Sequence, residues 1–240
     1  MPIQLFIDAQ ENNYVSALKT FLTIKLLYPN GKSKLNNKEK LFIQFVLQIT
    51  RKTLNTHIQL LINKQWLILN TKTNFYQIKA FDKIREEKSW TVRLAFKVYH
   101  SNIQNIQAIT GAVIYGYLHK DFWRKVKRKK VVQIKGCTYC FLSPRFNYKE
   151  QYAPVSVYGV NQLFNISTAT ASRLKNSAFK EKYIKLKKNY SDPIPGQSGI
   201  KEMVSMFETE SNLVFKKGKY RQQLIDTTYP NFHFKKRKSL

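Results

Sequence analysis

The sequence predicts an α+β fold in two tandem domains, residues 1–88 and 89–240, each combining helices with a small β-hairpin. Two observations lead to this prediction. Apolar residues recur at helical spacing in several segments and alternate with polar residues in others. Two of the helical segments also start after a similar hydroxyl-bearing residue, Thr50 in the first and Ser167 in the second. With 43% hydrophobic and 14% aromatic residues, the chain of 240 residues has enough apolar material for a folded core.

The charge of the chain favours a polyanionic partner. Lysine and arginine number 42 against 14 aspartate and glutamate residues, a formal net charge of +28. AT-rich coding would explain many of the lysines, but it does not explain the scarcity of acids. Nucleic acid is the leading partner class, ahead of a ribosomal surface or an anionic membrane.

The first domain is expected to begin with a short strand or a tail, followed by two helices. Residues 1–12 are assigned to a short strand or a tail, and Tyr14 to Leu27 to a helix that ends at Pro29-Asn30-Gly31. Lys38 to Gln48 is predicted to form the next helix. The residues expected on its inward face are Leu41, Phe42, Phe45 and Val46.

The next helix carries the main candidate site. Thr50 is a suitable N-cap, and Leu54, Ile58 and Leu61 share one apolar face. The remaining surface is polar and cationic and has no acid, so it suits phosphates and base edges in a major groove. An ordinary solvated amphipathic helix is the alternative. The candidate residues are Arg51, Lys52, Asn55, Thr56, Gln59 and Asn63.

A strand over 64–69, a turn over 70–74 and a strand over 75–78 follow. The order helix, turn, helix and hairpin, with Ile49 to Ile58 at the helix entry, resembles the winged helix-turn-helix family of DNA-binding domains over roughly residues 14–80. The resemblance implies that the helix enters the major groove and that the hairpin, with Lys72 at its tip, touches the backbone. Arg51 and Lys52 would then anchor phosphate, while Asn55, Thr56 and Gln59 would read bases. Similar trihelical units also serve as protein-binding modules.

The second domain is expected to start with a strand and a long helix. Phe81 to Lys88 is assigned to a connector, and residues 90–98 alternate as a strand does. Asn102 to Trp123 is predicted to be helical, with small residues at Ala108, Gly111 and Ala112 that allow a second backbone to approach. A helix pair, a dimer contact or ordinary core packing would each account for them.

A dense basic run follows this helix. We expect it to contact phosphate, although cations at a helix end also complement its dipole and a solvated face remains the alternative. The candidate residues are Arg124, Lys127, Arg128, Lys129 and Lys130. A hairpin over 131–142 comes next and contains Cys137 and Cys140. A single CxxC is at best half a zinc site, so no metal is predicted.

A second candidate helix follows a helix over 157–165. Ile166-Ser167 aligns with Ile49-Thr50, and Ala171, Leu174 and Ala178 form the inward face, so this stretch too resembles a winged-helix recognition helix. Lys175 takes the place of Ile58 on the inward side. It is expected to snorkel, or the helix is rotated or ends early. The candidate DNA contacts are Thr168, Ser172, Arg173, Asn176 and Lys180.

A second wing-like hairpin is predicted near the C-terminus, after a loop over 192–199 and a short helix over 200–207. Its cationic tip is expected to lie on phosphates. The tip residues are Lys216, Lys217 and Lys219, and a basic tail over 235–238 adds a nonspecific contact.

No catalytic signature is present in the sequence. There is no Gly-rich phosphate loop and no HExxH, the 4 histidines are scattered, and the acids are unclustered. We therefore predict neither enzyme activity nor a cofactor. The longest apolar run, Ile109 to Leu118, is too short to span a bilayer, so a cytoplasmic protein of a prokaryote or phage-infected cell is expected.

The expected function is sequence-specific binding of double-stranded DNA by a monomer or homodimer. Two such domains in one chain are similar to the replication initiators of small plasmids and phages, which bind repeated origin sequences and recruit host replication proteins. A transcriptional regulator of a mobile element, working with host transcription proteins, is the alternative. A structural or RNA-associated protein without sequence preference is the alternative of a different class.

Overall fold

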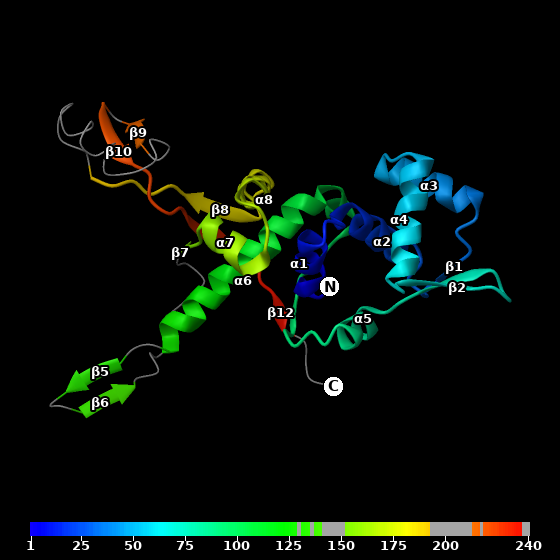
Figure 1. Cartoon of the computed structure of the whole chain (residues 1–240), viewed down its shortest axis with the longest axis horizontal. Coiled ribbons are helices and arrows are strands. Elements are labelled where there is room, and N and C mark those ends of the chain that lie inside the picture. Colours follow the sequence, from blue (N-terminus) through cyan, green and yellow to red (C-terminus); the bar gives the residue numbers. More distant parts are fainter. Residues whose placement is uncertain (129–130, 135–136, 141–151, 193–212, 217, 237–240) are drawn as a thin grey trace.

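The computed structural model of the chain describes residues 1–128, 131–134, 137–140, 152–192, 213–216 and 218–236 (Figure 1). It combines helices with small antiparallel sheets, so the α+β class is confirmed at this coarse level. Within the described ranges, no helix has both the length and the apolar character needed to cross a membrane.

The chain begins with helix α1 (Ile3–Glu11), so the strand or tail predicted for residues 1–12 is wrong. Ile3, Phe6 and Ala9 recur every three residues and are fully buried, which is the pattern of a helix packed on one side. The amino group of Met1 donates to the carbonyl of Phe96, 2.8 Å away, and fixes the start of the chain.

A helical unit with one small sheet follows α1. Its elements are α2 (Val15–Leu27), β1 (Lys32–Ser33), α3 (Asn37–Leu47), α4 (Arg51–Asn63), β2 (Leu67–Asn70) and β3 (Phe75–Ile78). The sheet is antiparallel, and its order β1-β3-β2 places the last strand in the middle. The helices and the hairpin predicted for residues 14–78 are therefore confirmed. The connector predicted after them is instead the short helix α5 (Phe81–Glu87).

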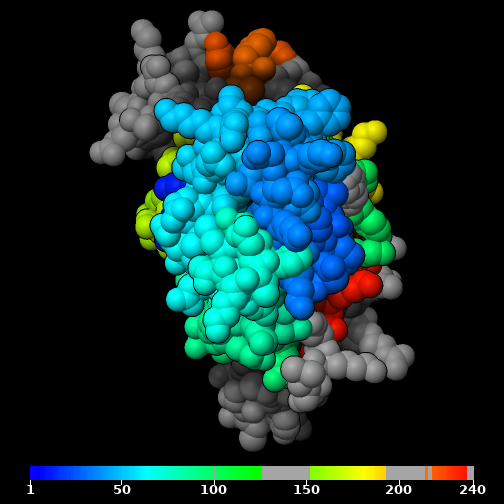
Figure 2. Space-filling model, turned by 90° about the vertical axis from the view of Figure 1, so that its right-hand side faces the viewer, coloured from blue at the N-terminus to red at the C-terminus, as the bar shows by residue number. Residues whose placement is uncertain are grey.

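Helix α3 lies where predicted but presents a different face to the core. Asn36 caps it through a capping box with Glu39, and Ile43 and Leu47 are its buried residues. The predicted inward face is wrong, because Leu41, Phe42 and Phe45 are 62%, 52% and 82% exposed. The stretch 41–47 is apolar on nearly every side, so its periodicity does not select one face. This end of the molecule faces the viewer in Figure 2.

The segment between the two halves holds less strand than predicted. Only β4 (Leu94–Ala95) forms within residues 90–98, and it pairs with β12 (Lys235–Lys236). An isolated bridge joins Pro2 to Ala95. The start, the middle and the end of the chain therefore meet at β4. The 3-10 helix η1 (His100–Asn105) then leads into α6 (Ile106–Arg128).

Helix α6 runs between the two halves of the molecule (Figure 1) and contributes to both hydrophobic clusters. Ile109 and Val113 belong to the first cluster, and Tyr115 and Leu118 to the second. A Cβ atom on Gly111 would lie 2.2 Å from the carbonyl oxygen of Leu174. The small-residue patch of α6 therefore brings a second helix of the same chain, α8, into close backbone contact.

The second half repeats the order of the first with two extra hairpins, β5-β6 and β9-β10. After the hairpin β5 (Val131–Ile134) and β6 (Cys137–Cys140) come β7 (Ala153–Pro154), α7 (Val157–Phe164), α8 (Thr168–Lys180), β8 (Ile184–Lys187), β9 (Leu213–Lys216), β10 (Lys219–Gln222) and β11 (Thr227–Pro230). The sheet order β7-β11-β8 again has its last strand in the middle. Strands β9 and β10 pair in the connection between β8 and β11, as the predicted second hairpin requires. The loop and helix predicted for 193–207 lie outside the described residues.

Candidate nucleic-acid interface

The turn between α3 and α4 sets the start of the first candidate helix. Gln48 adopts a left-handed conformation with φ of 54°, which ends α3. The Thr50 hydroxyl then accepts a hydrogen bond from the amide of Thr53 at 3.2 Å, so the predicted N-cap is confirmed.

The turn between α7 and α8 has the same construction. Asn165 is left-handed with φ of 48° and ends α7. The Ser167 hydroxyl accepts from the amide of Thr170 at 3.3 Å, which confirms the second predicted N-cap. Both of the helices that follow are 13 residues long.

The two helices also end alike. The left-handed residues Gln65 (φ 56°) and Lys182 (φ 59°) follow α4 and α8. The next residue then donates its amide back to the helix, Trp66 to Leu61 and Tyr183 to Ala178, both at 2.9 Å. The helix, its cap and its exit are thus repeated as one unit, although only part of the outer surface has the same residue types.

Helix α4 gathers its predicted site residues on one exposed surface. Leu54, Ile58 and Leu61 are buried as predicted. The exposed residues are Arg51, Lys52, Asn55, Thr56, Gln59 and Asn63. Gln59 Nε2 donates to Asn63 Oδ1 at 3.1 Å, so these two amides are held side by side. The surface offers cations, amides and a hydroxyl group to a ligand.

His57 anchors α4 through a contact that the sequence does not predict. Its Nδ1 lies 2.8 Å from the Thr20 hydroxyl on α2. Burial lowers the pKa of this half-buried imidazole below its ordinary value. A lone histidine beside an apolar helix face gives no sequence signal for this contact, because its partner lies in another helix.

Lys72 lies in the tight turn between β2 and β3. The side chain of Asn70 accepts from the amides of Lys72 and Thr73 at 3.0 and 3.2 Å, and Asn74 is left-handed with φ of 55°. Lys72 is exposed at this turn, as the predicted wing contact requires.

Helix α8 presents a smaller polar surface. Thr168, Arg173, Asn176 and Lys180 are exposed, whereas Ser172 is half-buried. Arg173 Nη2 donates to the Thr170 hydroxyl at 3.1 Å, so the guanidinium lies back along its own helix. A DNA contact by Arg173 would require this side chain to rotate outward.

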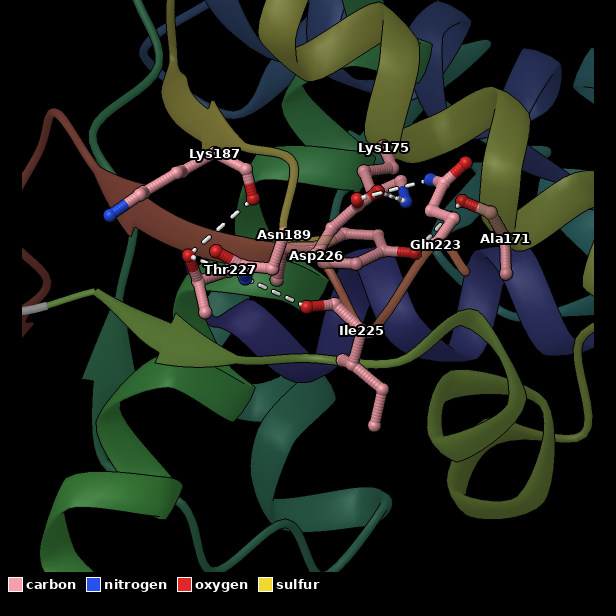
Figure 3. A network of polar contacts seen from close by, with 9 residues as sticks. Ala171, Lys175, Lys187, Asn189, Gln223, Ile225, Asp226 and Thr227 are labelled. Carbon is pink, nitrogen blue, oxygen red and sulfur yellow. Dashed lines mark hydrogen bonds and ion pairs between the residues drawn. The ribbon is translucent and has the colours of Figure 1, made fainter. Parts of the chain in front are cut away.

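The position of Lys175 differs from every expectation drawn from the sequence. It neither snorkels to solvent nor disturbs the helix, because α8 runs to Lys180 with Ala171, Leu174 and Ala178 buried as predicted. Instead, Lys175 Nζ lies 2.5 Å from Asp226 Oδ2, and the two side chains are only 10% and 7% exposed (Figure 3). Asp226 follows 51 residues later in the chain, which is why local patterning cannot reveal it.

Further polar contacts hold α8 and the neighbouring strands. The hydroxyl of Tyr115 on α6 donates to the carbonyl of Ala171 at 3.1 Å, and burial, with Asp226 as a smaller cause, raises the pKa of that phenol. Asn189 Nδ2 donates to the carbonyl of Ile225 at 2.9 Å (Figure 3). These contacts position α8 against both α6 and the connection that leads to β11.

The predicted phosphate contacts are only partly described by the structure. On α6, Asp121 pairs with Arg124 and also with Lys125, at 2.7 Å. Burial alone would raise the pKa of the Asp121 carboxyl, but these two cations together lower it. Lys127 and Arg128 continue the α6 backbone, and Lys216 and Lys219 lie in β9 and β10. Lys129, Lys130 and Lys217 lie outside the described residues.

Within the described part of the chain, no group of three or more histidine, cysteine, aspartate or glutamate residues is arranged to hold a metal ion. Comparisons with protein families, with curated proteins and with solved structures gave no match to this chain. A functional argument for the protein therefore depends on the geometry and charge described above.

Proposed function

We propose that the protein binds double-stranded DNA with sequence specificity through two winged-helix units, with α4 and α8 as the major-groove helices. The observation that carries the proposal is the repeated unit. Apart from the hairpins β5-β6 and β9-β10, which are extra in the second half, both halves have the order helix, strand, helix, helix, strand, strand, with the last strand central in the sheet. Both place a helix with a Thr or Ser cap after a left-handed turn residue.

The surface chemistry supports DNA as the ligand. Neither α4 nor α8 contains an acid, and each exposes hydroxyl, amide and cationic groups. Such groups form the bidentate and single hydrogen bonds that distinguish base edges in the major groove. The net charge of +28 supplies the attraction to phosphate that any sequence preference needs as its background.

Among DNA-binding proteins, we favour a replication initiator of a plasmid or phage, acting in the cytoplasm of its host. Two reading helices in one chain suit repeated or paired binding sites, and an initiator would then bring host replication proteins to them. A transcriptional regulator of a mobile element uses the same chemistry. The arrangement of the bound sites separates these roles, since direct repeats favour initiation and a single palindrome favours regulation.

Selection of bound sequences from a random duplex library at about 150 mM salt tests the proposal, because nonspecific attraction is partly screened there. We expect a recovered motif bound roughly 10³-fold more tightly than bulk DNA. The variant Lys52→Ala with Gln59→Ala should lose that preference. A matched control, Lys83→Ala with Gln107→Ala, removes the same residue types from exposed positions outside α4 and should keep it.

Two results would contradict the proposal. If no sequence is enriched and RNA competes as well as DNA, the protein coats or packages nucleic acid through charge. If the α4 variant still selects the same motif, then α4 is not the reading helix.

A further inference from the structure

A cavity of about 380 Å³ lies between the C-terminal half of α6 and the segment from β11 to β12. Its walls include four aromatic side chains and two cationic ones, namely Trp123, Tyr229, Phe232, Phe234, Lys120 and Arg124. The volume falls within the range of small-molecule sites. None of its lining residues comes from α4 or α8.

The aromatic wall is fixed by close packing against α6. Phe232 and Phe234 meet edge to face, with ring centroids 5.2 Å apart. A Cβ atom on Gly116 would lie 2.6 Å from Phe232 Cζ, so the absence of a side chain at this position allows the ring to rest on the helix backbone. Trp123, further along α6, is half-buried and lines the same cavity. The rings thus form a preformed apolar wall rather than a loose surface cluster.

The rim of the cavity carries crowded positive charge. Burial lowers the pKa of the Lys120 ammonium, and repulsion from Lys236 and Arg124 lowers it further. The nearby carboxylate of Asp121 already pairs with Arg124 and Lys125. Among the described residues, no carboxylate forms an ion pair with Lys120. A bound anion would therefore relieve this repulsion.

We propose that this cavity binds a nucleobase together with its phosphate, the base against the aromatic wall and the phosphate at Lys120. Any of the bases can stack on aromatic side chains, because every base has a π-face. A purely apolar ligand would leave the cationic rim unused, and inorganic phosphate alone would leave the aromatic wall unused. The nucleotide could come from solution or from an unpaired stretch of a strand, since both present the same chemistry.

This inference does not rest on duplex binding by α4 and α8. It assigns a second, separate nucleic-acid contact to the C-terminal half of α6 and the segment from β11 to β12. Either proposal can fail while the other holds, because the variants that test them are in different elements.

The test is isothermal titration calorimetry of the full chain with two probes, dTMP and a single-stranded oligothymidylate of about eight nucleotides. We expect Trp123→Ala to weaken binding by roughly tenfold or more, as the loss of one stacked base implies, and Lys120→Glu to weaken it at least as much because it places a carboxylate at the phosphate position. Lys38→Glu makes the same charge change at an exposed lysine on α3, at the other end of the molecule (Figure 1), and should bind as the parent does. Circular dichroism of each variant shows whether the fold is kept.

The outcomes separate clearly. Binding of dTMP with the expected losses supports a site for free nucleotides, and binding of the oligonucleotide alone supports a site for an unpaired strand. Failure of both probes to bind overturns the proposal. So does an equal loss in Lys38→Glu and Lys120→Glu, or parent-like binding by Trp123→Ala, because charge alone would then explain the association.

Discussion

The Lys175 ammonium on α8 lies 2.5 Å from the carboxylate of Asp226, the residue that precedes β11, and both side chains are buried. The equivalent position in α4 holds Ile58, which is buried in the first hydrophobic cluster. The second unit therefore holds its candidate reading helix by a charge pair where the first unit uses hydrophobic packing.

Lys175→Met is expected to destabilise the protein by about 3–5 kcal/mol, because it leaves the Asp226 carboxylate buried without its partner. Urea unfolding followed by circular dichroism measures this change. Adding Asp226→Leu should recover most of the loss, since replacing both ions with apolar groups of similar size is often neutral or stabilising. Lys180→Met on the exposed side of α8 serves as the control, with an effect within about 0.5 kcal/mol. A small effect of Lys175→Met alone would show that the pair does not hold α8.

Arg173→Ala is expected to reduce discrimination at one base pair of the selected site by roughly tenfold, or about 1.4 kcal/mol, which lies in the lower part of the range of about 1–3 kcal/mol for a bidentate contact. Competition binding with sites substituted one base pair at a time measures it. Lys182→Ala, an exposed cation just beyond α8, is the matched control. If Arg173→Ala leaves every position unchanged while the fold persists, the second unit is an interaction module and not a reader.

Replacing Lys127, Arg128, Lys129 and Lys130 by alanine is expected to flatten the salt dependence of DNA binding. Each lost phosphate contact should lower the slope of log K against log salt by roughly 0.9 on B-DNA. Sequence preference should stay the same, because these residues are assigned to phosphate and not to bases. An unchanged slope would remove this run from the interface.

The stability of the first unit is expected to fall as pH decreases below about 6.5, the ordinary pKa of histidine. Burial lowers the pKa of His57 in the folded protein. Between that lowered value and the ordinary one, the unfolded chain binds more protons, so acid favours unfolding and the stabilisation is complete only above the ordinary pKa. Urea midpoints measured across this range should change less in His57→Gln than in the parent. An identical pH profile for the two proteins would contradict the assignment.

The sequence predicts the parts of the site that depend on neighbouring residues. Thr50 and Ser167 are recognisable as N-caps because a helix start is encoded within about four residues. The apolar spacing of Leu54, Ile58 and Leu61 likewise locates the buried face of α4.

The parts that failed depend on distant packing. The face of α3 is chosen by what lies beneath Ile43 and Leu47, and the apolar stretch itself allows several choices. The role of Lys175 depends on Asp226, and α1 packs against Phe96 and α6. No window of the sequence contains both members of these pairs. The aromatic cavity is hidden for the same reason, since Trp123 and Phe232 meet only after folding.

Because α6 supplies buried residues to both hydrophobic clusters, this one helix joins the units that carry α4 and α8. On our proposal, the mutual orientation of α4 and α8 determines which side of one duplex each of the two half-sites must present to the protein. Inserting about five base pairs between them would turn one half-site by about half a helical turn, to the far side of the DNA. The long helix α6 would thus determine the spacing between the two DNA half-sites that the chain recognises.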